Sequence, residues 1–530
     1  MDDQRESRAF DRRTLLSAAA LFGAAAALPT SVARAAASVS GAPEVTFASG
    51  RVRGLPTEGG GKAFLGIPYG MPPVRELRFA APRKVTPWKG VRDATAFGPS
   101  APQPGVPTVG DNWLTVNVWA PENVSTPLPV MVWIYGGGYT RGGTDEPTYE
   151  GTLLAREGRV VVVTVNYRSG VEGFTWIDGA PPNRGLLDLV AALRWVNNNI
   201  HAFGGDSGRV TVFGESSGAG CVAALLAMPS AVGLFKRAVV QSMPRPQVTP
   251  ELAAEVGAEI AATAGRGATV ADLSQVAPDE LTAFGAQVNA RMTSFVDRWG
   301  VIAAISGTYG PVVDGVVLPQ TPYAAMKNGV SRHVDLIIGH TRDENLLFSA
   351  LQGLVGNVTR AQREAAVTMF APRGDAAAYT AAFPGSTDSQ LYELVKSDWL
   401  FRMPAAKLAE AHATAGGATY FYEFTHDVVG VNGVRGALHG MDVPLVFGNF
   451  RPGVYSLVYA GPPTASDLAL GNEVRAAWAR FAHTGDPGWP EYRPGGQVKI
   501  WGGRNPVGRY PEETSRRVAR GDGFGPYGPL

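Results

Sequence analysis

Cysteine is almost absent from this chain, because Cys221 is the one cysteine in 530 residues. A single thiol excludes an intramolecular disulfide and a metal site built from several cysteines, and we interpret Cys221 as a core residue. An excess of one charge is also missing, since 47 basic residues face 46 acidic ones and the formal net charge is +1. Proteins that bind nucleic acid usually carry a clear basic excess, so we expect no nucleic-acid partner.

Long hydrophobic runs are lacking as well. The apolar run from Leu15 to Leu28 is shorter than the ~20 residues that a membrane-spanning helix needs. It follows Arg12 and Arg13 and precedes Ala33-Arg34-Ala35, an A-x-A cleavage pattern. Residues 1–35 therefore resemble a twin-arginine export signal; the alternative is a general secretory signal in which the arginines only supply positive charge. We expect a mature chain that begins near Ala36, works in the periplasm or outside the cell, and has no stable membrane anchor.

What the chain does contain is a series of short apolar, β-branched runs separated by helical patterns. Apolar residues make up 45% of the sequence, enough for a large core. The runs lie at 130–135, 160–167, 210–213, 334–338 and 420–424. Such nearly continuous apolar runs are typical of strands buried on both faces of a parallel sheet. Helical spacing at 184–200 and 467–484, with Gly485 as a C-terminal cap, completes an α/β doubly wound pattern.

The rest of the mature chain shows no low-complexity linker. We therefore expect residues 36–530 to form one large α/β domain rather than several. Residues 250–300 and 350–415 are alanine-rich and mostly helical in pattern. We expect them to form a helical lid or subdomain over the sheet.

A candidate nucleophile lies in Gly214-Glu215-Ser216-Ser217-Gly218, a G-x-S-x-G match. On its own this motif is weak, but an apolar strand pattern enters it and a helical pattern of small residues at 219–228 leaves it. That strand–turn–helix context is the one a nucleophile elbow requires. An ordinary strand-to-helix turn is the alternative interpretation.

A serine nucleophile needs a base, and the base is oriented by an acid. In α/β-hydrolases these follow in the order Ser, Asp or Glu, His, which leaves His426 and His439 as the histidines in loop-like segments beyond the strand at 420–424. Of the two we favour His439, because Gly436 and Gly440 flank it in a turn. The acid should follow a strand and precede the histidine. Glu344 and Asp343, just after the strand at 334–338, both fit.

Several motifs together resemble the type-B carboxylesterases, the serine esterases that include the cholinesterases. The matching segments span roughly residues 43–510. They are Phe64-Leu65-Gly66-Ile67-Pro68-Tyr69, Leu114-Thr115-Val116-Asn117-Val118-Trp119, Trp133-Ile134-Tyr135-Gly136-Gly137-Gly138-Tyr139, Asn183-Arg184-Gly185-Leu186-Leu187-Asp188 and Val212-Phe213-Gly214-Glu215-Ser216-Ser217-Gly218. The resemblance implies an α/β-hydrolase fold with a large, mostly parallel sheet.

The resemblance also implies the roles of the site residues. Ser216 would be the nucleophile, His439 the base and Glu344 the acid, since Glu344 matches the glutamate of the family's D-E-G triplet although Asn345 replaces the glycine. The backbone N–H groups of Gly137, Gly138 and Ser217 would form the oxyanion hole. No metal or organic cofactor is implied, and the expected partner is a small ester substrate.

Other interpretations stay open. A lipase acting on long-chain esters, an amidase, or a non-catalytic binding member of the family would share this pattern, and the sequence does not indicate an oligomeric state. We interpret Glu215, beside the nucleophile, as buried support rather than a site for cationic substrates. Ser242 could support His439. Tyr139, Trp176, Trp299 and Phe348 could line a substrate pocket or simply pack in the core.

Overall fold

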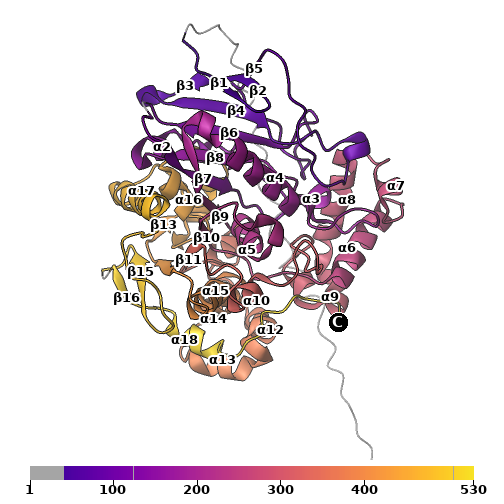
Figure 1. The fold of residues 1–530 in the computed structure, drawn as a ribbon. Coiled ribbons are helices and arrows are strands. Elements are labelled where there is room, and N and C mark those ends of the chain that lie inside the picture. Colours follow the sequence, from indigo (N-terminus) through magenta and orange to yellow (C-terminus); the bar gives the residue numbers. More distant parts are fainter. Residues whose placement is uncertain (1–40, 123, 505) are drawn as a thin grey trace, which may run out of the picture.

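The computed structural model describes residues 41–122, 124–504 and 506–530, so the expected export signal at 1–35 lies outside the described residues. The chain builds an eleven-stranded sheet in the order β16-β15-β12-β11-β10-β9-β7-β8-β6-β4-β3 (Figure 1). These strands are β3 Leu55–Pro56, β4 Lys62–Pro68, β6 Thr115–Ala120, β7 Leu128–Ile134, β8 Val161–Val165, β9 Gly205–Glu215, β10 Arg237–Gln241, β11 Asp335–Thr341, β12 Thr419–Phe424, β15 Gln497–Trp501 and β16 Val507–Arg509.

Two smaller sheets accompany it. One has the order β1-β2-β5, formed by Glu44–Phe47, Gly50–Arg53 and Val91–Asp93. The other pairs β13 Val428–Val429 with β14 Arg435–Gly436.

The middle of the large sheet is parallel, from β8 through β7, β9, β10, β11 and β12 to β15. Every residue of β7, β8 and β12 is buried. Strands covered by helices on both faces need apolar side chains on both, and this explains their continuous apolar runs. The expected α/β-hydrolase architecture is therefore confirmed.

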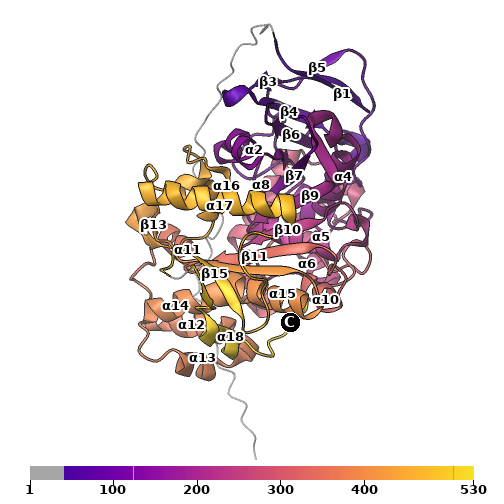
Figure 2. The same cartoon turned by 60° about the vertical axis from the view of Figure 1, so that its left-hand side comes forward.

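Helices cover both faces of the sheet (Figure 2). On one face, α4 Arg184–Asn199, α5 Ser217–Ala227, α10 Pro322–Lys327 and α15 Met403–Thr414 pack in succession. On the other face, α17 Ala465–Thr484 packs against α2 Thr152–Gly158 and α16 Asp442–Phe447. Gly485 ends α17 with a φ of 82°, as the sequence predicted.

The two segments expected to be helical are helical. The first holds α6 Pro250–Thr263, α7 Val270–Leu273, α8 Pro278–Ala290 and α9 Val296–Ala304. The second holds α12 Arg360–Phe370, α13 Ala376–Ala382, α14 Asp388–Ser397 and a π-helical turn, η8, at Asp398–Arg402, which runs into α15. The other α-helices in the described ranges are α3 Gly170–Phe174, α11 Leu346–Leu351 and α18 Glu513–Val518.

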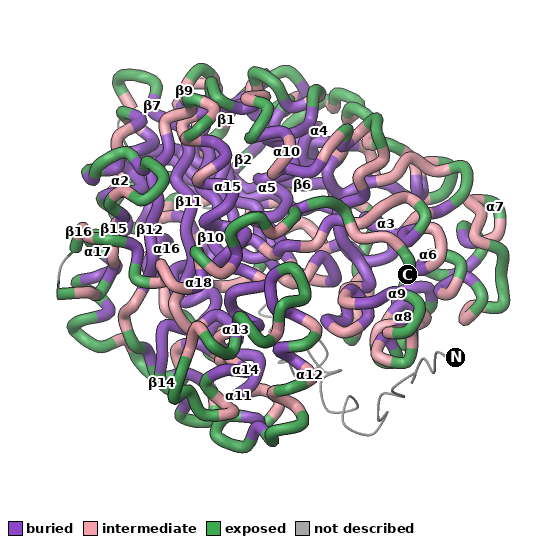
Figure 3. Tube along the Cα trace, turned by 90° about the horizontal axis from the view of Figure 1, so that it is seen from below, coloured by how far each residue is buried: buried purple, intermediate pink, exposed green. Residues whose placement is uncertain are grey.

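Buried residues run continuously through the centre of the molecule, whereas exposed residues lie on the outer loops and helix faces (Figure 3). One apolar cluster joins residues from Phe47 to Ala519.

No helix in the described ranges has both the length and the apolar character to cross a bilayer. The sheet thus gives the loops at the carboxyl ends of its strands a rigid base, which is where α/β folds bind ligands.

Candidate active site

Ser216 occupies the turn between strand β9 and helix α5. Its φ of 55° and ψ of −128° are unusual for a residue with a side chain, and such strain is typical of a nucleophile elbow. The turn is fixed because the Ser216 N–H donates to the carbonyl of Gln241 at 2.9 Å. Every residue of α5 is buried, so the turn cannot relax without moving the core.

The glycine-rich loop after β7 lies directly against this turn. A Cβ atom placed on Gly136 would be 3.0 Å from the Cβ of Ser216. Gly137 has a φ of 115°, and a Cβ there would be 2.3 Å from the carbonyl oxygen of Arg141, so glycine is required. Ser217 is the first residue of α5, where backbone N–H groups have no intrahelical acceptor.

The structure brings Glu344 and His439 together. Glu344 follows β11, His439 follows β14, and Nδ1 of His439 lies 2.5 Å from Oε2 of Glu344. The other carboxylate oxygen of Glu344 accepts the Thr341 N–H at 2.9 Å. Glu344 is fully buried and His439 is 7% exposed. The carboxylate is therefore held at both oxygens and can fix the orientation of the imidazole.

A second carboxylate faces the other ring nitrogen. Oε1 of Glu215, the residue before Ser216, lies 3.1 Å from Nε2 of His439. Nε2 of the imidazole thus lies against the side chain of the residue that precedes Ser216. The sequence placed Glu215 as buried support and missed this contact, although its position beside the serine was a usable signal.

The pKa values in this cluster depend on each other. Burial lowers the pKa of His439, but the charges of Glu215 and Glu344 outweigh burial and raise it to about 9. Burial raises the pKa of Glu215 to about 8, with His439 opposing the rise and Asp442 adding to it. Burial also acts upward on Glu344, yet His439 and the nearby Ser242 hydroxyl bring its pKa below the usual value. Glu344 therefore has the lower pKa of the two glutamates and stays ionised to lower pH than Glu215.

The rival candidates have other partners. Oδ2 of Asp343 lies 2.7 Å from the Arg342 guanidinium and accepts the Ala437 N–H at 2.9 Å. Nε2 of His426 lies 2.7 Å from Oδ1 of Asp467, near the start of α17. Asp343 thus links the two loops that carry Glu344 and His439, while His426 belongs to a separate pair.

Two phenylalanines flank the imidazole. The ring centroid of Phe401, in η8, lies 4.4 Å from that of His439. The ring centroid of Phe348, in α11, lies 5.3 Å from that of His439. Phe348 was among the expected pocket residues; Phe401 was not singled out, because nothing in its local sequence marks a π-helical turn. Trp299, in contrast, is buried and donates from Nε1 to Glu255 at 2.9 Å, which fits core packing.

The arrangement can perform acid–base and nucleophilic chemistry with protein groups. A hydroxyl on a strained turn, an imidazole with one nitrogen on a carboxylate, and a glycine loop beside the hydroxyl are the parts of an acyl-transfer site. Within the described ranges, no group of three or more His, Cys, Asp or Glu side chains is arranged to hold a metal ion.

Comparison with known proteins agrees with this geometry. The model of the carboxylesterase family matches residues 41–501. The para-nitrobenzyl esterase of Bacillus subtilis is 36% identical over 467 residues, which cover 84% of this chain and 92% of that protein. The acetylcholinesterase of Bungarus fasciatus is 31% identical over 86% of this chain and 81% of its own length.

Solved structures give the same result. A PNB esterase structure superposes with a TM-score of 0.79 at 34% identity, covering 90% of this chain and 99% of the other. A carboxylesterase of Geobacillus stearothermophilus reaches 0.78 at 33% identity with the same coverage. Because both the family model and these relatives span most of the chain, this protein is an enzyme of the carboxylesterase family.

Proposed function

We propose that this carboxylesterase hydrolyses small to medium carboxylic esters through an acyl-enzyme, with Ser216 as nucleophile, His439 as base and Glu344 as acid. The observation that carries the proposal is the 2.5 Å contact between Nδ1 of His439 and Glu344, with Nε2 against the residue that precedes Ser216. A serine hydroxyl is a poor nucleophile until a neighbouring base removes its proton. The buried Glu344 carboxylate stabilises the imidazolium that forms when it does.

In the proposed reaction, the Ser216 hydroxyl attacks the ester carbonyl while Nε2 of His439 accepts its proton. Backbone N–H groups of Gly137, Gly138 and Ser217 bind the oxyanion. The imidazolium then protonates the leaving alcohol. Water attacks the acyl-enzyme with His439 again as the base, and the acid product leaves.

The Ser216→Ala variant tests this proposal. We expect it to lose labelling by an organophosphate or a sulfonyl fluoride and to lose acyl-enzyme formation, because the attacked oxygen is gone. Ser306→Ala is a suitable control, since Ser306 is also buried and also has a positive φ of 54°. Stoichiometric labelling of folded Ser216→Ala would place the nucleophile elsewhere.

The size of the substrate needs a separate experiment. We expect hydrolysis of p-nitrophenyl esters to be fastest with short to medium acyl chains in solution. A rate that rises sharply once a long-chain ester exceeds its solubility would identify a lipase instead. Hydrolysis of matched anilides but not esters would identify an amidase, and no turnover of either class would indicate a binding protein.

A further inference from the structure

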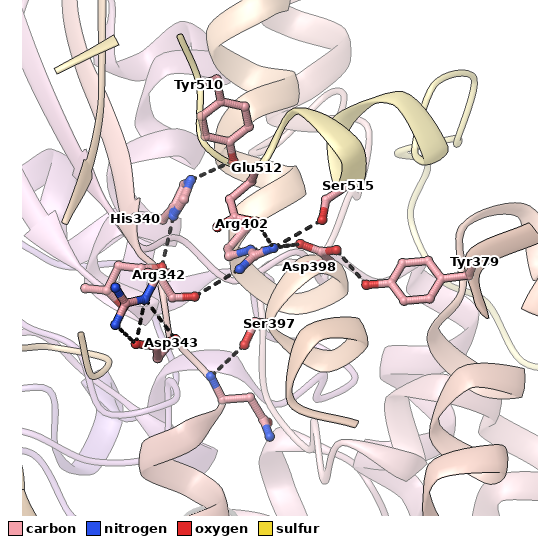
Figure 4. A network of polar contacts seen from close by, with 12 residues as sticks. His340, Arg342, Asp343, Tyr379, Ser397, Asp398, Arg402, Tyr510, Glu512 and Ser515 are labelled. Carbon is pink, nitrogen blue, oxygen red and sulfur yellow. Dashed lines mark hydrogen bonds and ion pairs between the residues drawn. The ribbon is translucent and has the colours of Figure 1, made fainter. Parts of the chain in front are cut away.

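A buried polar cluster surrounds Arg402 (Figure 4). Arg402 is 2% exposed. Its guanidinium donates to Oδ1 of Asp398 at 2.8 Å, to Oε2 of Glu512 at 2.8 Å and to the Ser515 hydroxyl at 3.2 Å. The second oxygen of Asp398 accepts the Tyr379 hydroxyl at 2.6 Å. So many fixed partners hold the guanidinium in one orientation.

The fourth contact of Arg402 leads toward the acid. Nη1 donates to the backbone carbonyl of Arg342 at 3.0 Å, two residues before Glu344. On the other side of Glu344, the N–H of Asn345 donates to the Ser397 hydroxyl at 3.0 Å. Residues 341–345, which we name the acid loop, are thus tied on both sides of Glu344 to residues at or next to η8.

The same turn also contacts the base. Phe401, the residue before Arg402, lies with its ring 4.4 Å from His439. Through Asp343 the acid loop is also bonded to Ala437, two residues before His439. A π-helical turn shifts the side chains that follow it relative to a regular helix and is frequent at functional sites. Here adjacent residues of one turn make both contacts: Arg402 bonds the acid loop, and Phe401 packs against the imidazole of His439.

We propose that Arg402 is a positioning residue that, together with Ser397, sets the acid loop so that Glu344 meets His439. This inference rests on the proposed function, because it assigns Glu344 and His439 as acid and base. Part of the support for Arg402 comes from the C-terminal segment, since Glu512 and Ser515 lie beyond residue 501, where the family match ends. The proposal therefore gives that segment a role in catalysis.

The alternative is that the cluster serves stability alone. A buried guanidinium that loses its partners destabilises a fold whatever lies nearby, so loss of activity in Arg402→Ala would prove little. Arg402→Lys keeps the charge but not the planar fork that reaches carboxylates and a carbonyl together. Ser397→Ala removes one hydrogen bond and leaves all charges in place.

Arg78→Lys is a matched control. Arg78 is 7% exposed, binds Glu172 at 2.7 Å, and donates to the backbone carbonyls of Ser274 and Val276. It has the same kind of surroundings as Arg402 without a contact to the acid loop among the described residues. Both exchanges should therefore lower the melting temperature.

Of the two arginine exchanges, only Arg402→Lys should change catalysis. We expect Arg402→Lys to lower kcat about 10- to 100-fold with KM within about threefold, since small misplacement of a catalytic group has effects of this size. The acid limb of the pH profile should move to lower pH, because a looser Glu344 stabilises the imidazolium less. Ser397→Ala should show the same changes, weaker, and its combination with Arg402→Lys should be non-additive.

The outcomes are distinct. If Arg402→Lys and Ser397→Ala fold and keep the wild-type kcat and pH profile, as expected for Arg78→Lys, the positioning role is wrong. If Arg402→Lys does not fold, kcat and the pH profile of Ser397→Ala and of Glu512→Gln, which removes the charge of one Arg402 partner, test the positioning role instead. If folded Ser216→Ala remains active, the proposed function fails independently of how the Arg402 variants behave.

Discussion

Replacing Glu215 by Gln should change how the activity depends on pH. The exchange keeps the shape of the side chain and removes a carboxylate that lies 3.1 Å from Nε2 of His439. At that distance, and with an effective dielectric constant of about 20, two unit charges attract by roughly 5 kcal/mol. One pKa unit corresponds to ~1.4 kcal/mol, so this attraction is large enough to control the protonation of the imidazole.

The expected shift in the pKa of His439 is smaller than this attraction alone would give. The Glu215 carboxyl has a pKa of about 8, so it is only partly ionised near neutrality, and His439 and Glu215 titrate as a pair. Glu344 still stabilises the imidazolium in the variant. We therefore expect the acid limb of kcat/KM to move to lower pH by about 1–2 pH units.

The direction follows from the charge. A negative Glu215 favours protonated His439, and a protonated base cannot accept the proton of Ser216. Despite burial, the charges of Glu215 and Glu344 raise the pKa of His439 to about 9, so they favour the protonated imidazole in the wild type. Glu215→Gln should thus be faster than the wild type on the acid side. At high pH it should be slower, by up to about tenfold, because a less basic imidazole accepts the proton less readily. The two profiles should cross.

The assay is kcat/KM for one soluble ester across the range in which the enzyme stays folded, with product measured by chromatography so that detection does not depend on pH. Glu172→Gln is the control, because Glu172 is equally buried and ion-paired with Arg78. An acid limb that stays in place in Glu215→Gln, or moves to higher pH, would refute the assignment of Nε2 of His439 as the titrating base.

Two further predictions concern the turn and the core. Gly137→Ala should lower kcat by ~10²–10³, as loss of an oxyanion donor does, because a Cβ there would be 2.3 Å from the Arg141 carbonyl oxygen and would displace the loop. Ser217→Ala should keep kcat within about threefold of the wild type, since only the backbone N–H of Ser217 is used. Equal losses of kcat in both variants would contradict the proposed oxyanion hole. Burial raises the pKa of the fully buried Cys221 thiol, so iodoacetamide should leave the folded enzyme's rate unchanged, and inactivation that tracks alkylation of Cys221 would be the contrary result.

The sequence predicted the parts of the fold that depend on local pattern. The run at 210–213 marked part of the second half of β9, but the strand extends over Gly205–Glu215. It is longer because Gly205 pairs with Leu128 on β7, and Gly214 and Glu215 pair with Val240 and Gln241 on β10. Pairing between distant segments leaves no local signal. Buried strands and long helices were predictable because their burial imposes a periodicity on the sequence.

The candidate site was predictable for a different reason. Ser216 lies in a short motif whose glycines serve a strained turn, so the chemistry constrains adjacent positions. Glu344 and His439 lie 95 residues apart. Flanking glycines favoured His439 over His426, but only the resemblance to a family selected Glu344 over Asp343. In the structure these four residues separate clearly, since Asp343 and His426 are each occupied by other partners.

The contacts that hold the site could not be predicted, and this follows from their geometry. Arg402 reaches Glu512 across 110 residues and the Arg342 carbonyl across 60. A bond to a backbone carbonyl places no demand on the residue type that supplies it, so nothing at position 342 announces the contact. Reactive residues can thus be recognised from short sequence motifs, whereas the residues that position them depend on contacts between segments about a hundred residues apart in the chain. If Arg402 positions the acid loop as proposed, two family members with the same Ser, Glu and His side chains can differ in how rigidly those side chains are held. A difference in kcat between two such members should then be traced to segments such as 512–515 as well as to the motifs.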